Sequence, residues 1–156
     1  MKKYYLIAPV LIVAGVIYYT GLYTYFIRND VQESLPATSD KPEASVQTLA
    51  SGNFVKVDLV HKGSGEAKII RFDDKNILRF ENFNVTSGPD LYVYLTKSVQ
   101  LTGDIKSLGD YVDLGLLKGT SGNQNYEIGS IDISEYKTAV VWCRRFGVLF
   151  TYAVMK

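Results

Sequence analysis

The chain has 156 residues, a formal net charge of +1, one histidine and one cysteine. So small a net charge excludes the strongly basic surface of a nucleic-acid-binding protein, and we expect no nucleic-acid partner. A single cysteine excludes an intramolecular disulfide and a zinc site built on several thiolates. A single histidine excludes a metal centre with two imidazoles, so we predict no metal site.

The N-terminal segment is apolar and long. Residues 4–27 contain no charged side chain, and tyrosines lie toward both of its ends. A helix of this length, rising about 1.5 Å per residue, spans a bilayer core of about 30 Å. Tyrosines at both ends are typical of the aromatic belts at the two membrane surfaces. Residues 1–27 are therefore predicted to form a single-pass membrane anchor that contacts lipid through residues 4–27.

The flanking charges predict the orientation of this anchor. Lys2 and Lys3 precede it, whereas Arg28 follows it with Asp30 and Glu33 close behind. The positive-inside rule then places the N-terminus in the cytoplasm and the C-terminal domain outside it, at the cell membrane. A cleaved signal peptide is the rival interpretation, because it shares the basic start and apolar core. No small-x-small cleavage site follows the apolar core cleanly, which favours an uncleaved signal-anchor.

Residues 28–51 differ in composition from the segments on either side. They are rich in Asp, Glu, Ser, Thr and Pro and contain no aromatic residue. Such a segment buries too little apolar surface to offset the entropy lost on ordering. We predict a flexible stalk between the membrane and the folded domain.

From residue 52 to residue 156 the apolar residues alternate with a period of two, which is typical of strands. Short strands separated by Gly- and Asp-containing turns predict an all-β domain, a small antiparallel β-sandwich or barrel-like structure behind the transmembrane helix. Gly63 to Gly65 is expected to form a turn, and residues 131–136 a short helical corner. The expected strands cover residues 54–61, 67–72, 77–81, 91–95, 126–128, 139–143 and 148–154.

Cys143 is the main candidate for redox chemistry. Alternation along its strand places Cys143 on the opposite face from Trp142 and Arg144. Free cysteine is among the most buried residue types, so core packing is one interpretation. The other is a reactive thiol, because a lone cysteine is unusual in an oxidising compartment and adjacent cations lower a thiol pKa. Of the two adjacent arginines, only Arg145 is expected to face the sulfur.

Three further places carry candidate binding residues. The glycine- and asparagine-rich segment 114–126 favours a tight loop, or alternatively a ligand rim formed by the side chains of Asn123, Asn125 and Tyr126. Asp90 follows Gly88 and Pro89, which predicts a turn and makes the carboxylate a minor ligand candidate. His61 ends a strand, where a capping or exposed role is favoured over metal ligation.

Four segments together resemble the DM-thirteen domain family, also called the electron-transfer DM-thirteen domain. They are residues 88–95, 114–119, 122–128, and 140–143 together with 146–150, and their order and spacing agree with the family over about residues 61–156. The resemblance implies an extracytoplasmic β domain whose characteristic cysteine is Cys143. It also implies a redox role, which in this family is sometimes accompanied by domains that bind haem.

The expected function is a membrane-anchored extracytoplasmic domain with a redox or electron-transfer role centred on Cys143, with Trp142 and Tyr126 as its surroundings. One histidine, one cysteine and scattered carboxylates form no recognisable catalytic set, so we do not expect a stand-alone enzyme. The sequence specifies no cofactor, and a haem or other redox group would belong to a partner protein. The alternative is a non-catalytic cell-surface binding or structural module in which Cys143 is core packing.

Overall fold

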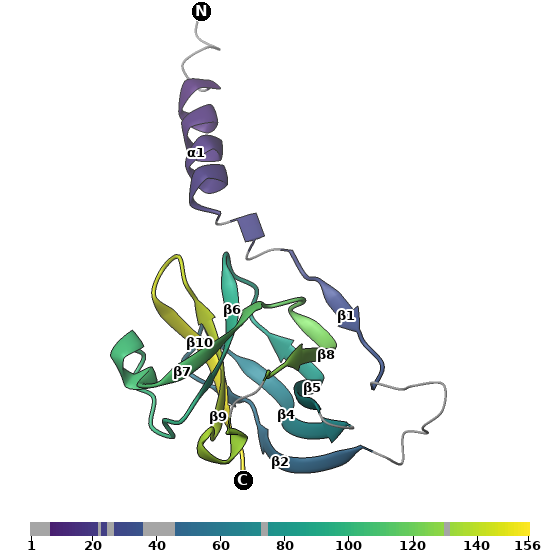
Figure 1. Cartoon of the computed structure of the whole chain (residues 1–156). Coiled ribbons are helices and arrows are strands. Elements are labelled where there is room, and N and C mark those ends of the chain that lie inside the picture. The colour runs from purple at the N-terminus through teal and green to yellow at the C-terminus, as the bar shows by residue number, and fades with distance from the viewer. Residues whose placement is uncertain (1–6, 22, 25–26, 36–45, 73–74, 130–131) are drawn as a thin grey trace, which may run out of the picture.

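The structure is a computed structural model that describes residues 7–21, 23–24, 27–35, 46–72, 75–129 and 132–156. Within these ranges, two five-stranded sheets form the β domain and one α-helix extends away from it (Figure 1). The elements are α1 (Ile7–Thr20), β1 (Asp30–Gln32), β2 (Gln47–Asn53), β3 (Val55–Lys56), β4 (Gly63–Phe72), β5 (Lys75–Val85), β6 (Leu91–Thr96), η4 (Ile105–Leu108), β7 (Tyr111–Leu116), β8 (Ser121–Glu127), η5 (Ile133–Glu135), β9 (Thr138–Cys143) and β10 (Val148–Val154).

The two sheets define a sandwich-like arrangement. The first sheet has the strand order β1–β8–β5–β4–β2, and the second has the order β3–β10–β9–β6–β7. Neighbouring strands are antiparallel except β1 and β8, which are parallel. The sheets are joined along one edge by two backbone hydrogen bonds of 3.0 and 3.1 Å between Ser51 and Lys156. The predicted all-β class and sandwich-like architecture are confirmed.

Aromatic side chains fill much of the space between the sheets. The Phe54 ring packs against the rings of Phe80 and Phe83, at centroid distances of 4.8 and 4.7 Å. Alternation directs Leu78 and Phe80 of β5 and Val141 of β9 into the same buried cluster. Burial of these side chains is the main favourable contribution to folding, since each removes a large apolar area from water.

β9 is buried along its whole length, because it is the central strand of the second sheet. Val141 and Cys143 face the core between the sheets, whereas Val140 and Trp142 face a second cluster on the outer side. The predicted strands 139–143 and 148–154 are confirmed as antiparallel neighbours. The predicted helical corner before β9 is confirmed as η5.

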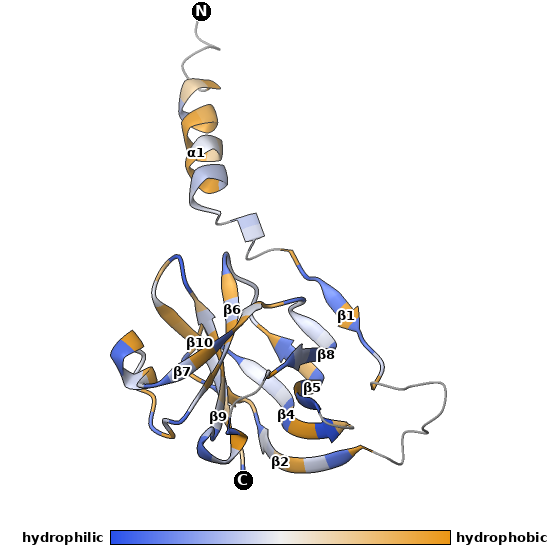
Figure 2. Ribbon diagram, in the orientation of Figure 1, coloured by the Kyte–Doolittle hydropathy of each residue, from blue (hydrophilic) through white to orange (hydrophobic). Residues whose placement is uncertain are grey.

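α1 is apolar on every side, and none of its side chains is buried. Figure 2 shows the apolar colouring on several sides of its turns, in contrast to the alternating colours of the strands. No helix in the described part of the chain is both long and apolar enough to cross a membrane. Residues 1–6, 22, 25 and 26 of the predicted anchor lie outside the described residues.

Both described ends of the predicted stalk contain strands. β1 pairs with β8 in the register Asp30 to Ser121, and β2 begins at Gln47, before the expected domain boundary at residue 52. Backbone pairing supplies the stabilisation that the polar side chains of this segment lack. The prediction of a flexible stalk over residues 28–51 is therefore wrong at these two ends, and residues 36–45 lie outside the described residues.

Three further predictions of local structure are corrected. The predicted strand 54–61 is reduced to β3, because the chain turns after Lys56. Gly65 lies in a bulge within β4, not in a turn, and its φ of +96° needs glycine. The predicted polar loop 114–126 consists mostly of the end of β7 and all but one residue of β8, joined by a tight turn.

Replacement of Phe80 by alanine tests the packing between the sheets. Phe80 is fully buried, so Phe80→Ala is expected to lower the free energy of unfolding by about 3–5 kcal/mol. Phe146→Ala is the matched control, because the Phe146 side chain is 46% exposed and its removal should change stability within about 0.5 kcal/mol. Urea unfolding followed by circular dichroism measures both values, and equal effects of the two substitutions would contradict the packing described.

Candidate functional site

Cys143 lies at one end of the core. It is the last residue of β9 and pairs with Leu91 of β6 and Val148 of β10. Its side chain points between the sheets and has no solvent exposure. The sulfur is therefore buried at the end of the sandwich, where turns and loops connect the strands.

Two short connections close over the Cys143 thiol. The Sγ–H donates to the Pro89 carbonyl oxygen at 2.9 Å, in the loop before β6. The turn between β9 and β10 follows Cys143 directly, and its backbone N–H groups at Arg145 and Phe146 act on the thiol pKa. The Arg144 N–H donates to the Asp90 carbonyl oxygen at 3.0 Å and ties the two connections together. Access to the thiol requires these two connections to separate, while the sheets can stay intact.

Burial raises the pKa of the Cys143 thiol above its ordinary value of 9.0. The Asp90 carboxylate raises this pKa further, whereas the N–H groups of Phe146 and Arg145 and the charge of Arg145 act in the opposite direction without outweighing burial. Arg145 thus acts on the thiol pKa in the expected direction, but the net shift is upward, because loss of hydration disfavours the thiolate more than one exposed cation favours it. At neutral pH the group is a protonated thiol.

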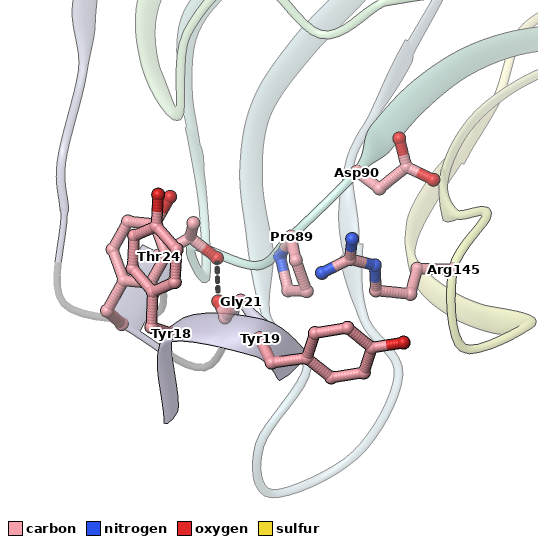
Figure 3. Close-up of a pocket in the computed structure, with 8 residues that line it drawn as sticks. Tyr18, Tyr19, Gly21, Thr24, Pro89, Asp90 and Arg145 are labelled. Atoms are coloured by element: carbon pink, nitrogen blue, oxygen red, sulfur yellow. Dashed lines mark hydrogen bonds between the residues drawn. The ribbon is translucent and has the colours of Figure 1, made fainter. Parts of the chain in front are cut away.

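A cavity of about 480 Å³ lies beside the loop that covers the thiol. Figure 3 shows Pro89, Asp90 and Arg145 on its domain side, with Tyr19 of α1 and Gly21, the residue that follows α1, opposite them. The end of α1 touches the loop closely, because a Cβ added to Gly21 would lie 2.7 Å from Arg145 Nη1 and 3.1 Å from Pro89 Cβ. The structure thus brings two predicted site residues, Cys143 and Asp90, together at one end of the domain.

His61 lies at the same end of the domain and has local partners. Its Nδ1 atom is 2.7 Å from Asp58 Oδ2, and its ring centroid is 4.5 Å from that of Phe150. Phe150 also packs under Gly88, where an added Cβ would lie 2.5 Å from its Cζ atom. Across the described ranges, no group of three or more His, Cys, Asp or Glu residues could hold a metal ion. The geometry of His61 fits a capping role.

Trp142 and Arg144 lie on the outer face of the second sheet, as alternation predicts. Trp142 is buried in a cluster with Tyr94. The Arg144 guanidinium lies 3.4 Å from the centroid of the Tyr92 ring, donates to the Tyr94 hydroxyl at 3.1 Å and forms an ion pair with Asp113. The cation–π contact and the ion pair fix Arg144 on this face and away from the thiol.

Tyr126 faces the core from β8 and stabilises the turn between β7 and β8. Its hydroxyl donates to Gln124 Oε1 at 2.7 Å and accepts from the Lys118 N–H at 3.1 Å. The Gln124 amide also bonds the N–H and the carbonyl of Gly119, at 3.1 and 2.8 Å. Both side chains are buried, so these polar groups stabilise the turn only because every one of them has a partner.

Asn123 and Asn125 alternate with Gln124 and Tyr126 and therefore lie on the opposite face of the first sheet. Asn125 Oδ1 accepts from Arg79 Nη1 at 2.8 Å. Asn123 Oδ1 accepts a backbone hydrogen bond from the β5 bulge at 2.9 Å. The predicted ligand rim of Asn123, Asn125 and Tyr126 is thus divided between two faces of a sheet, and the structure does not bring these three side chains together.

A network of charged side chains on this outer face was not predicted. Arg79 is buried and donates to Glu81 Oε1 at 2.7 Å, and Lys68 Nζ lies 2.5 Å from Glu81 Oε2. Glu33, in the predicted stalk, accepts from Lys118 Nζ at 2.8 Å and from the Asn125 N–H at 2.6 Å. The Arg79–Glu81 spacing of two residues on one strand was a signal for a shared face, but no sequence signal pointed to Glu33, which follows β1.

Residues 53–155 match the electron transfer DM13 family, and the chain belongs to this family. No curated protein and no solved structure shows a significant match. The β domain is therefore an electron-transfer-related domain, and the predicted family resemblance is confirmed.

The burial and the raised pKa of the thiol predict slow alkylation. In a Val99→Cys variant, which carries both thiols in one chain, Cys143 should react with iodoacetamide much more slowly than the exposed position 99. Peptide mass spectrometry measures the alkylation rates at positions 143 and 99, and equal rates would show that the thiol is open in the native state.

The raised pKa also predicts how stability depends on alkaline pH. The free energy of unfolding that is linked to the thiol should be complete below the ordinary pKa of 9.0 and decline as the pH rises through the higher folded-state pKa.

The charged network predicts how stability depends on acid pH. The hydrogen bond from Lys68, opposed by burial and assisted by Arg79, lowers the pKa of Glu81 below its ordinary value of 4.5. The stability from this group is present above pH 4.5 and lost as the pH falls through the lower folded-state pKa. Glu81→Gln should lower the free energy of unfolding at neutral pH by about 1–3 kcal/mol and flatten this acid-side decline. Glu127→Gln, in a side chain that is 76% exposed, is the control and should change neither.

Proposed function

We propose that this protein is a membrane-anchored electron-transfer module that lies outside the cytoplasm and uses the Cys143 thiol as its redox group. Membership of an electron transfer family supports the general role. One observation supports the choice of Cys143: the sulfur lies under two turns joined by a few hydrogen bonds, at the end of the sandwich. Local opening of such turns costs far less free energy than global unfolding.

The uncharged segment 4–27 supports the anchor. Its described helix, α1, is apolar and has no buried side chain, so the β domain provides no core in which α1 could be sheltered from water. Lys2 and Lys3 before the segment support a cytoplasmic N-terminus and an extracytoplasmic β domain. The chain would then cross the cell membrane once.

The proposed chemistry balances with a redox group on a partner protein. In a one-electron step, Cys143 would give one electron to the oxidised partner group, for example a ferric haem that would become ferrous. Cys143 would also release the thiol proton that is hydrogen-bonded to the Pro89 carbonyl, which leaves a thiyl radical at the sulfur. The Asp90 carboxylate, close enough to raise the thiol pKa, is available to take that proton. The partner would approach the end of the domain that Pro89 and Arg145 form, because the loop and the turn next to the sulfur lie there.

Potentiometric titration of the full chain in lipid vesicles tests this role. The protein is held at stepped potentials with dissolved redox mediators, then unfolded, and the remaining thiol is alkylated and counted by mass spectrometry. We expect the Cys143 thiol to be lost in one transition without denaturant. The rate of loss should be the same at low urea, because opening of two turns exposes little surface.

A Cys143→Ala chain in the same vesicles is the control. It measures how much oxidation occurs at residues other than Cys143. Survival of the wild-type thiol at every potential until urea unfolds the domain would overturn the redox role. A rate of loss that rises with urea in parallel with global unfolding would overturn it as well.

The complete burial of Cys143 favours a second candidate, a non-catalytic cell-surface binding or structural module. In that case the sulfur is core packing, and its hydrogen bond to Pro89 only stabilises the loop before β6. A thiol that stays reduced throughout the titration would support this candidate.

A further inference from the structure

α1 ends directly against the β domain. Thr20 is its last residue, and the next residue, Gly21, packs against Pro89 and Arg145. A few residues later the Asn29 N–H already donates to Thr120 Oγ1 at 3.1 Å, and β1 follows at once. The chain therefore leaves no long spacer between α1 and the domain, in contrast to the stalk expected from the sequence.

Two exposed apolar side chains, Phe146 and Leu116, lie at this same end. β6 begins just after Pro89, and its first residue, Leu91, pairs with Cys143 at the end of β9. Phe146, in the turn that follows Cys143, lies here as well. The second residue of β6 pairs with Leu116 at the end of β7, which brings Leu116 to the same end.

The segment 57–61 also lies at this end. β3 is antiparallel to β10 and so runs toward the end at which β10 begins. Thr86 Oγ1, in the loop that leads into β6, donates to the Val60 carbonyl at 2.8 Å. Leu59 and Val60 therefore neighbour the loop on which α1 ends.

The apolar side chains at this end are strongly exposed. Leu59 is 82% exposed, Leu116 59%, Val60 58% and Phe146 46%. Several exposed apolar side chains at one end indicate a contact surface, since water is a poor solvent for all of them. The exposed charges among them are of both signs, so burial of apolar area would contribute more to such a contact than net charge.

The tyrosines of α1 indicate where the headgroup layer of a bilayer would lie relative to this surface. Tyr18 and Tyr19 lie at the domain end of α1 and are 77% and 86% exposed. Tyrosine prefers the headgroup layer of a bilayer, where its ring is in apolar and its hydroxyl in polar surroundings. In a chain anchored by α1, the headgroup layer would thus coincide with the end of the β domain that carries Leu59 and Phe146.

We infer that this end of the β domain rests on the bilayer surface, with Leu59, Val60, Leu116 and Phe146 in the headgroup layer. The inference rests on the proposed anchor and goes beyond it, because an anchor on a long stalk would leave the domain free in solution. Lipid is the partner because the apolar surface of α1, exposed on every side, leads directly into this end. The cavity beside the loop that covers Cys143 then opens at the membrane surface.

A depth measurement on the full chain in phosphatidylcholine–phosphatidylglycerol vesicles tests this inference. An environment-sensitive fluorophore is attached at position 60 in a Val60→Cys, Cys143→Ala chain, and its quenching by lipids with spin-labelled headgroups is recorded. The matched control carries the fluorophore at Val99, a valine that is 51% exposed beyond the far end of β6. We expect several-fold stronger quenching at position 60 than at position 99.

Vesicle flotation, performed on the same samples, separates the two proposals. Weak quenching at both positions in a chain that floats with the vesicles would overturn the docking and leave the anchor standing. Equal, strong quenching at both positions would overturn it too, because the domain would then lie on its side. Shielding of position 60 that depends on protein concentration and not on lipid would assign the surface to a second copy of the chain and overturn the inference. A chain that does not float would overturn the anchor and the docking together.

Discussion

The hydrogen bond from the Cys143 thiol to the Pro89 carbonyl connects the parts of this protein that bear on its function. It links the end of the central strand β9 to the loop before β6, and the end of α1 packs on that loop. The thiol is not exposed to solvent. The segments that lie over it are two short connections between strands and not a layer of strands. In the proposed redox role, this position would keep the sulfur protonated at rest and bring it within reach of a partner once the two connections open.

Docking on the membrane would restrict how that partner approaches. The cavity bordered by Pro89, Asp90 and Arg145 would face the lipid headgroups, so a redox protein would reach it along the membrane plane. A partner held in the same membrane meets this requirement readily, because two-dimensional diffusion keeps it at the correct height. In an oxidising compartment, burial would then protect the free thiol from soluble oxidants.

The outer face of the first sheet shows a different use of polar groups. Arg79 is buried there only because Glu81, Asn125 and the carbonyl of Glu33 accept its hydrogen bonds. The short parallel strand β1 covers this network and approaches β8 closely. At Gly122, whose φ is +100°, an added Cβ would lie 2.0 Å from the Val31 carbonyl oxygen. Ordering of β1 therefore depends on this glycine and on the charged network together.

Alternation of apolar residues was sufficient to predict the β class, the strands β9 and β10, and the opposite faces of Cys143 and Trp142, because side-chain direction in a strand follows from sequence parity alone. Only the tertiary structure decided the partners of each side chain. It divided Asn123 and Asn125 from Tyr126, and it buried Cys143 deeply enough to raise its pKa despite the adjacent arginines. Burial and pairing depend on which segments, distant in sequence, come together. The sequence cannot state this, since β1 meets β8 across some ninety residues with no local signal for that contact.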